Sequence, residues 1–304
     1  LITNWLKLNS RWTAKSWQPD IMEQRLATLV FCYDWYGRSG DEAFQQLISE
    51  SIRLQASCLA IDWKRLHDHN ARVTALRGLI IAEAALGADA DDLDNLMEFL
   101  VPLVDGMLYA DGGHKSRMAD THLAVMRDLI EIRNTGLANE LEQLAWLDRT
   151  IAKMGSICRM WRHADGQFAR FNGAGVSNPD IIEETLARAG QKGKLLQQAP
   201  HSGFLRFSSG RSTIIMDVGK PEADAEVAGL GTLGFEFAVG QNLLVINPGQ
   251  ASNDPNLQRL LCSTKAHSTL TLDGQNSSDF NAGRLAEVDN IEMGPAEGGL
   301  LAVA

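Results

Sequence analysis

The chain has 304 residues, 45% of them hydrophobic, and a formal net charge of −10. This length is enough for two domains, and the acidic balance argues against a general binder of nucleic acid or of anionic membranes. No apolar run approaches the roughly 18 residues of a transmembrane helix, and no signal peptide is visible. Because the chain opens at Leu1 without a Met and ends on apolar residues, we expect it to be a piece of a longer protein.

Residues up to 163 show the spacing of amphipathic helices. Apolar residues recur three or four positions apart over 93–107 and 144–161, which places them on one helix face. Shorter stripes of the same kind cover 22–33, 44–52 and 73–80. Turn and cap residues separate the stripes at 39–41 and 87–89. We expect roughly six helices in this region, with consecutive helices antiparallel.

The composition changes near residue 163. All seven Trp and all three Tyr lie at or before Trp161, whereas 18 of the 27 Gly follow His163. Short apolar segments that are typical of strands lie at 204–207, 212–218, 233–237, 242–246 and 268–272. Strands that follow one another without helices between them indicate an antiparallel sheet.

These patterns predict an α+β protein with two domains. A helical domain covers residues 1–163, a connector with one short helix at 180–189 covers 164–200, and an antiparallel β domain covers 201–304. Ligand sites concentrate at domain junctions, so we expect a polar cleft between the two domains.

A crowded polar segment follows the helix that ends near residue 107. His114, Arg117 and His122 lie close together after the Gly112-Gly113 turn, where glycine allows backbone conformations that other residues resist. Imidazole and guanidinium groups in such a corner suit an anionic substrate and proton transfer. The alternative for each His is a structural or capping role.

Other polar residues have simple structural interpretations. His67 and His69 lie in a polar loop before a helix, and Asn70 is a natural cap residue there. His163 falls at the end of the last long helix, where a positive charge is favourable. His267 lies just before a predicted strand, where a buried, hydrogen-bonded ring is one interpretation and a substrate-facing ring is the other.

Common sequence motifs for cofactors and metals are absent. There is no P-loop, no GxGxxG after a strand, no GxSxG and no HExxH, and the four Cys show no CxxC spacing. We therefore expect no cofactor and no metal ion, and we interpret the cysteines as buried free thiols.

The order of segments resembles the heparinase II/III-like family of polysaccharide lyases over most of the chain. Five pieces carry the resemblance: DGGH at 111–114, RHADG at 162–166 with FNG at 171–173, GTLGFEF at 231–237, LVINPG at 244–249, and TKAHSTLTLDG at 264–274. Their order across a switch from helices to strands is more specific than any one of them.

The resemblance implies a fold and a reaction. The fold is an incomplete (α/α) toroid followed by an antiparallel β-sandwich. The reaction is β-elimination on a polysaccharide that contains uronic acid. One group neutralises the C6 carboxylate, a base removes the C5 proton, and an acid protonates the leaving oxygen at C4.

The family's functional residues match this chain unevenly. Asn70 matches the Asn of an Asn-His pair, but Ala71 stands in the place of the His. His122 matches the His of a Tyr-His pair, but Thr121 stands in the place of the Tyr. The strand His of the family matches His267.

Some family members also hold a metal ion between strands. The places of two ligands in those members fall here on Gly229 and Asn247, and His267 alone would not hold a zinc ion.

The resemblance makes a polysaccharide lyase our leading hypothesis, with an acidic polysaccharide as partner. We assign Asn70 and Arg117 to carboxylate neutralisation, and His122, His114 or His267 to proton transfer. The alternative is a catalytically degenerate relative that binds glycans or serves a structural role. The family suggests a periplasmic location, and the oligomeric state stays open.

Overall fold

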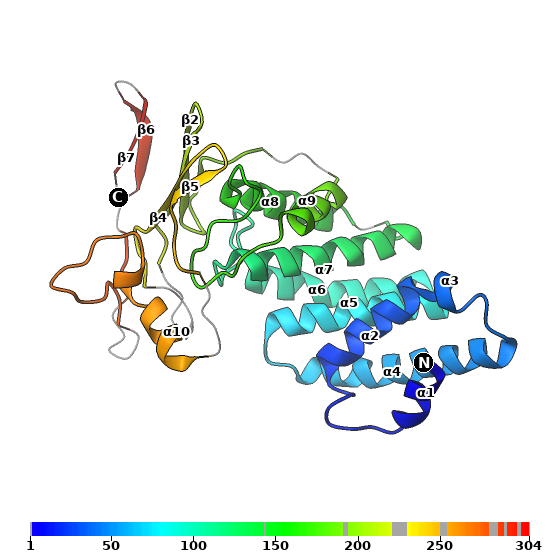
Figure 1. Cartoon of the computed structure of the whole chain (residues 1–304). Coiled ribbons are helices and arrows are strands. Elements are labelled where there is room, and N and C mark those ends of the chain that lie inside the picture. Colours follow the sequence, from blue (N-terminus) through cyan, green and yellow to red (C-terminus); the bar gives the residue numbers. More distant parts are fainter. Residues whose placement is uncertain are drawn as a thin grey trace. The chain divides into compact units, whose positions relative to one another are not determined.

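The computed structural model describes residues 2–303 except 143, 191–193, 221–229, 250–253, 280–284, 289–290 and 297–298 (Figure 1). The chain forms two compact units, each composed of two sequence segments. The helical unit is Leu1–Met107 with Arg127–Asp148, and the β unit is Leu108–Met126 with Arg149–Ala304. The predicted domains are continuous in sequence, and their boundaries at 163 and 200 stay a prediction.

Six long helices precede residue 163, in agreement with the expected number, although no predicted stripe covers residues 119–138, which form α7. They are α2 (Pro19–Phe31), α4 (Glu42–Asp62), α5 (His69–Leu86), α6 (Ala90–Met107), α7 (Ala119–Ala138) and α8 (Ala145–Trp161). Three short helices accompany them within the described residues: α1 (Ile2–Leu8), α3 (Tyr33–Tyr36) and the 3-10 helix η1 (Trp63–Arg65).

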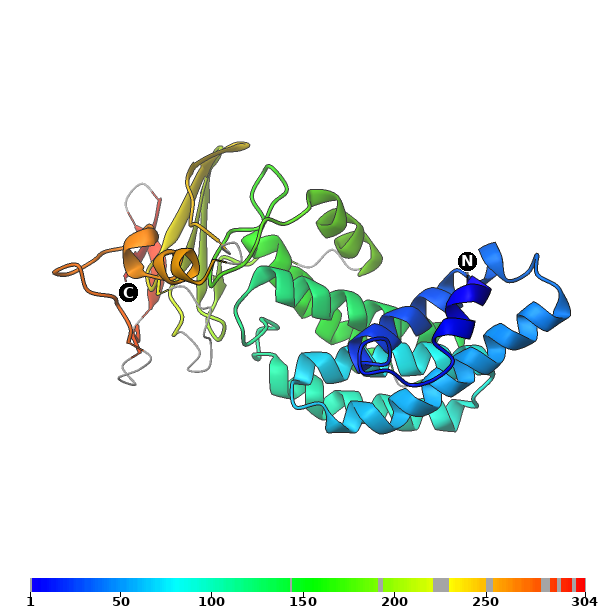
Figure 2. The ribbon, with the colours of Figure 1, turned by 60° about the horizontal axis from the view of Figure 1, so that its bottom comes forward.

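Helix α5 is the centre of the helical unit. It packs against α2, α4 and α6, and these blue and cyan helices lie side by side in Figures 1 and 2. Asp68 caps its start by accepting a hydrogen bond from the Ala71 amide at 3.0 Å. Gly87 ends it in the left-handed conformation, with φ of 84°. The short connection then turns the chain back into α6.

A buried ionic cluster joins three helices of this unit. Arg77 of α5 donates to Glu23 of α2 at 2.6 Å and to Asp128 of α7 at 2.7 Å. Glu131 lies 3.4 Å from the same guanidinium, and the Thr74 hydroxyl donates to Asp128 at 2.6 Å. One cation therefore faces three carboxylates in the interior.

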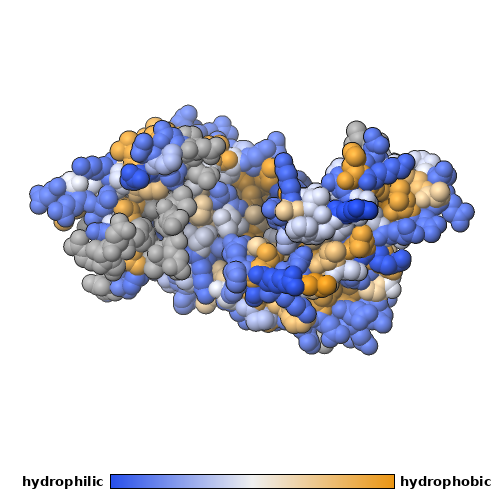
Figure 3. All heavy atoms as spheres, turned by 90° about the horizontal axis from the view of Figure 1, so that it is seen from below, coloured by the Kyte–Doolittle hydropathy of each residue, from blue (hydrophilic) through white to orange (hydrophobic). Residues whose placement is uncertain are grey.

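Some apolar side chains of the helical unit reach the surface. Leu8, Trp12 and Trp35 are mostly exposed. Figure 3 shows apolar residues in orange between polar ones on one face of the molecule. Among the described helices, none combines the length and apolar character needed to cross a membrane.

The β unit contains a five-stranded antiparallel sheet with the order β1-β2-β3-β4-β5. Its strands are β1 (Gln198–Ala199), β2 (Phe204–Ser209), β3 (Ser212–Asp217), β4 (Phe235–Val239) and β5 (Asn242–Val245). A separate antiparallel hairpin consists of β6 (Glu292–Ala296) and β7 (Gly299–Val303). The remaining helices are α9 (Pro179–Arg188), α10 (Pro255–Leu261) and η2 (Thr264–Ala266).

Four of the five predicted strands and the connector helix are present, but the strand predicted at 268–272 is wrong. The Phe235 amide donates to the Ser268 backbone oxygen at 3.4 Å, but other bonds to this segment come from the side chains of Ser268 and Thr269, which donate to the backbone oxygens of Phe235 and Thr232. Leu270 and its neighbours continue as irregular chain up to the Asp273-Gly274 turn.

All four cysteines are free, as the absence of metal-ligand spacing suggested, but only one of them is buried. Cys158 lies in the α8 core, whereas Cys32 is exposed between α2 and α3, and Cys58 and Cys262 are intermediate. The prediction of buried thiols is therefore correct only for Cys158.

Candidate active site of the β unit

The Gly112-Gly113 corner is a tight reversal that only glycine fits. The Tyr109 amide donates to the Gly113 oxygen at 2.8 Å, which closes the turn. Gly112 has φ of 92°, and a Cβ at this position would lie 2.5 Å from Lys153 Cβ. The corner therefore packs directly against α8 of the same unit.

Asp111 anchors this corner to the segment before β2. One carboxylate oxygen accepts from the Gly113 amide at 3.0 Å. The other accepts from the amides of His201 and Ser202, at 2.9 and 2.8 Å, and from the Ser202 hydroxyl at 3.1 Å. Four donors on one carboxylate make Asp111 a structural clamp.

Arg117 is a brace inside the β unit. Its side chain is 3% exposed and pairs with Asp217 at the end of β3. Nε donates to the Ser202 oxygen at 2.8 Å, and Nη1 donates to the Lys220 oxygen at 3.1 Å. Asn172 completes the arrangement by donating from Nδ2 to the other Asp217 oxygen at 2.9 Å. The guanidinium therefore neutralises a carboxylate of the chain itself.

His122 is completely buried, and both ring nitrogens are occupied. Nε2 lies 3.0 Å from the Met154 carbonyl, which only accepts, so Nε2 carries the proton. Nδ1 accepts from the His114 amide at 3.3 Å, and the ring meets Trp161 edge-on at 5.1 Å between centroids. Burial lowers the pKa of His122 to about 3, so the ring is neutral at ordinary pH.

His114 is also buried and hydrogen-bonded locally. Its Nδ1 accepts from the Ser116 amide at 3.1 Å and lies 2.8 Å from the Ser116 hydroxyl. The structure thus brings His114, Arg117 and His122 together, and the hydrogen bonds given above for these residues lie within the β unit.

Asn70 lies in the helical unit, apart in sequence and in unit from the other candidates. It is the second residue of α5 and is partly exposed. The prediction that it caps the helix is wrong, because Asp68 supplies the capping oxygen.

His267 is the candidate with an uncommitted ring nitrogen. Nδ1 lies 3.2 Å from Oδ1 of Asn247, and Nε2 has no hydrogen-bond partner within the described part of the chain. Burial lowers the pKa of His267, and the charge of Asp217 opposes this shift. Its position in the segment before 268–272 is as predicted, without the strand that was expected to follow.

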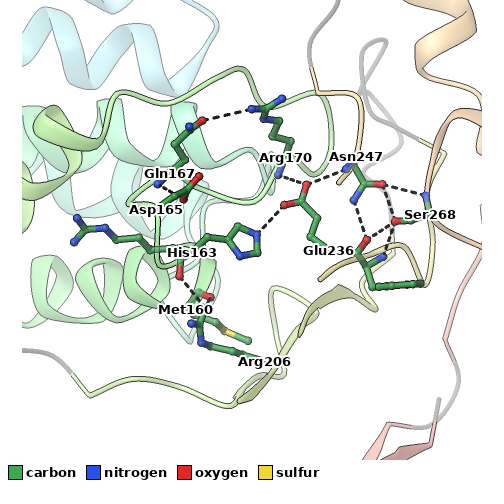
Figure 4. Close-up of polar contacts among 11 residues, drawn as sticks. Met160, His163, Asp165, Gln167, Arg170, Arg206, Glu236, Asn247 and Ser268 are labelled. Atoms are coloured by element: carbon green, nitrogen blue, oxygen red, sulfur yellow. Dashed lines mark hydrogen bonds and ion pairs between the residues drawn. The ribbon is translucent and has the colours of Figure 1, made fainter. Parts of the chain in front are cut away.

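A second buried pair, His163 and Glu236, was missed as a functional contact at the sequence level. His163 Nε2 lies 2.8 Å from Glu236 Oε2, and the two side chains are almost fully buried. Glu236 Oε1 accepts from the amides of Arg170 and Asn247, at 2.9 and 3.0 Å (Figure 4). The signal in the sequence is an isolated Glu within an apolar strand, FEFAV, and His163 is its partner rather than a simple helix-end charge.

The described residues do not form a metal site. No group of three His, Cys, Asp or Glu side chains among them is arranged to hold an ion. Three residues of this chain correspond to the family's metal ligands. Asn247 and His267 are hydrogen-bonded to each other through the side-chain oxygen of Asn247, and Gly229 lies outside the described residues.

Comparison with known proteins identifies the architecture first. Heparinase III has a TM-score of 0.68 at 15% identity, covering 98% of this chain and 52% of that chain. Heparan sulfate lyase HepC from Pedobacter heparinus has a TM-score of 0.66 at 18% identity, covering 90% and 49%. The fold is therefore an incomplete (α/α) toroid followed by an antiparallel β domain, and the chain spans about half the length of these structures.

The sequence comparisons point to the same group of proteins. The family model "Heparinase II/III-like, C-terminal" matches residues 191–297. FtsZ-localized protein C of Caulobacter vibrioides (strain NA1000 / CB15N) is 27% identical over 235 residues, 73% of this chain and 38% of that protein. The matched domain and the shared fold confirm the predicted resemblance of this chain to the heparinase II/III-like family.

Proposed function

We propose that this chain is a catalytically degenerate lyase-fold protein that binds an acidic glycan without cleaving it. The environment of His122 carries the proposal. A base or acid for β-elimination must reach a substrate proton and must change its protonation near the working pH. His122 has no exposed surface, both of its nitrogens are engaged, and its pKa is about 3.

Two neighbouring residues support the same proposal. Thr121 precedes His122 where the family has a Tyr, and an aliphatic hydroxyl is far too weak an acid to replace a phenol. Arg117 donates to Asp217 and to backbone carbonyls in the interior. Its guanidinium is therefore not available to bind a uronate carboxylate.

The nature of the ligand rests on the family. Heparan sulfate lyase HepC and heparinase III are named for an acidic polysaccharide, which supports a glycan of that class as the ligand here. The curated relative is named for its localisation with FtsZ and not for a sugar, which favours a role without catalysis.

The test measures glycan cleavage and glycan binding with the same protein preparations. Heparan sulfate, alginate and other uronans are incubated with the chain, and ultraviolet absorbance reports the C4–C5 double bond that β-elimination creates. Microscale thermophoresis with labelled oligosaccharides measures binding, and neutral dextran is the control. We expect binding of at least one acidic glycan with no absorbance above the protein-free control; absorbance that grows with protein concentration would sink the proposal.

A second candidate function is an active lyase that retains only some of the family's catalytic residues. The observation in its favour is His267, whose Nε2 is buried and finds no partner among the described residues, so its use as a base requires that substrate binding expose it. Asn70 would neutralise the carboxylate by the match to the family. This candidate predicts product formation that His267→Ala abolishes, with the matched surface variant His201→Ala as the control.

A further inference from the structure

Asn247, just after β5, is the centre of a buried hydrogen-bond cluster. It is completely buried, and its Oδ1 lies 3.3 Å from the Ser268 amide, 3.2 Å from the Ser268 hydroxyl and 3.2 Å from His267 Nδ1. Its Nδ2 donates to the Phe235 oxygen at 3.5 Å. Figure 4 shows Asn247 between Glu236 and Ser268.

The hydrogen-bond partners in this cluster determine which side-chain atoms donate and which accept. A backbone N–H only donates, so the Asn247 atom that faces the Ser268 amide is the oxygen and not the amide nitrogen. That oxygen only accepts, so the neighbouring Nδ1 of His267 must carry a proton. A neutral His267 ring therefore has Nδ1–H and an unprotonated Nε2.

The same arrangement is unsuited to a cation. A divalent ion needs lone pairs that converge on it, from carboxylates, thiolates or unprotonated ring nitrogens. Here the Ser268 amide and Nδ1 of His267 both donate to one neutral carbonyl oxygen, so the His267 nitrogen nearest to Asn247 is protonated. Glu236, whose carboxylate is hydrogen-bonded to the Asn247 amide, also accepts from His163 and Arg170.

We propose that Asn247 takes the structural place that a metal ligand has in other family members, so that hydrogen bonds and not an ion connect the residues after β5 to the 267–268 segment. Asn247 is also a positioning residue, because it fixes His267 with Nδ1 protonated and Nε2 as the acceptor. This inference is independent of whether the chain cleaves a glycan.

The tautomer of His267 is measured by long-range ¹H–¹⁵N correlation NMR on the chain labelled with ¹⁵N-histidine. We expect His267 in the Nδ1–H form in the unmodified chain. Asn247→Ala removes the acceptor and shifts the ring toward the Nε2–H form that a histidine side chain favours in water. Asn276→Ala is the matched control, because Asn276 accepts from the Thr264 amide at 3.0 Å in the same region, without a bond to His267. A dominant Nε2–H form in the unmodified chain overturns the proposal even if Asn247→Ala does not fold.

Metal independence is measured on the same unmodified chain. It is loaded with zinc or calcium, passed through gel filtration and assayed for metal content and for Tm before and after EDTA. We expect no stoichiometric metal and the same Tm in all conditions, because an ion bound to the native state would raise Tm by mass action. One equivalent of zinc or calcium retained through gel filtration, together with a fall in Tm on chelation, overturns the proposal.

Discussion

Arg117 and Asp217, one hundred positions apart, form a buried ion pair that ties the Gly112-Gly113 corner to the end of β3. Removing one partner leaves the other charge buried without compensation, which typically costs about 3–5 kcal/mol. We expect Arg117→Ala and Asp217→Ala each to lower the free energy of unfolding by this amount in urea titrations.

The matched control for this pair is Arg38→Ala. Arg38 pairs with Asp34 at 2.7 Å, but both side chains are about three-quarters exposed, so its loss should stay within about 0.5 kcal/mol. A result in which Arg117→Ala keeps full stability and loses only glycan binding would contradict the bracing role and restore Arg117 as a substrate contact.

His122 should make stability depend on pH in a defined window. Its folded pKa of about 3 lies below the ordinary 6.5, so between these values the unfolded chain binds a proton that the folded chain does not. Stability is therefore full above the unfolded pKa and falls as pH drops through this window, by up to about 1.4 kcal/mol per pH unit.

The measurement compares urea unfolding of the unmodified chain and of His122→Gln from pH 7 to pH 4. Gln keeps a polar side chain but does not titrate, so the difference between the two curves isolates His122 from the carboxylates. We expect His122→Gln to be less stable at pH 7 and the gap to narrow as pH falls. A constant gap would show that His122 is not held neutral by burial.

The sequence predicted the helices well because their signals are local. Every member of the α8 stripe, from Leu144 to Trp161, is buried as the spacing implies. The strand at 268–272 could not be judged in the same way, because its pattern of alternating residues is common to strands and to irregular segments. The conformation of this segment depends on the hydrogen bond from the Phe235 amide to the Ser268 hydroxyl, which joins distant parts of the chain.

The sequence predicted which residues lie close together at the candidate site, but not what those residues do there. Local sequence places His114, Arg117 and His122 beside a glycine corner, and the structure brings these three together. Their burial depends on Asp217, Met154 and other residues far along the chain, which no spacing rule reveals. The His163–Glu236 pair was missed for the same reason.

The buried cluster of Arg77 should make stability fall as pH rises. Burial is the largest cause that raises the pKa of Glu23 to about 7, Arg77 opposes it, and the Asp128 charge adds to it. The folded chain then holds a proton that the unfolded chain releases above the ordinary value of 4.5, so this contribution is fully present below pH 4.5 and is lost up to about pH 7.

Glu23→Gln tests this dependence. Gln is neutral at every pH and keeps an oxygen that accepts from Arg77, so its stability relative to the unmodified chain should improve between pH 4.5 and pH 8. We expect a relative gain on the order of 1–3 kcal/mol by thermal or urea unfolding. Glu98→Gln, at an exposed position of α6, is the control for loss of a surface charge. An equal effect of Glu23→Gln at both pH values would contradict a raised pKa.

Alanine substitutions at Gly112 and Gly87 distinguish the cost of a strained backbone from the cost of a steric clash. Both have positive φ, 92° and 84°, but a Cβ on Gly112 would lie 2.5 Å from Lys153 Cβ, whereas a Cβ on Gly87 meets nothing within 4 Å. Gly87→Ala should cost about 1 kcal/mol through its left-handed conformation alone. Gly112→Ala adds displacement of α8 backbone to the same strain, so we expect a loss of about 3 kcal/mol or more by urea unfolding. Equal losses for the two variants would mean that the corner does not press against α8.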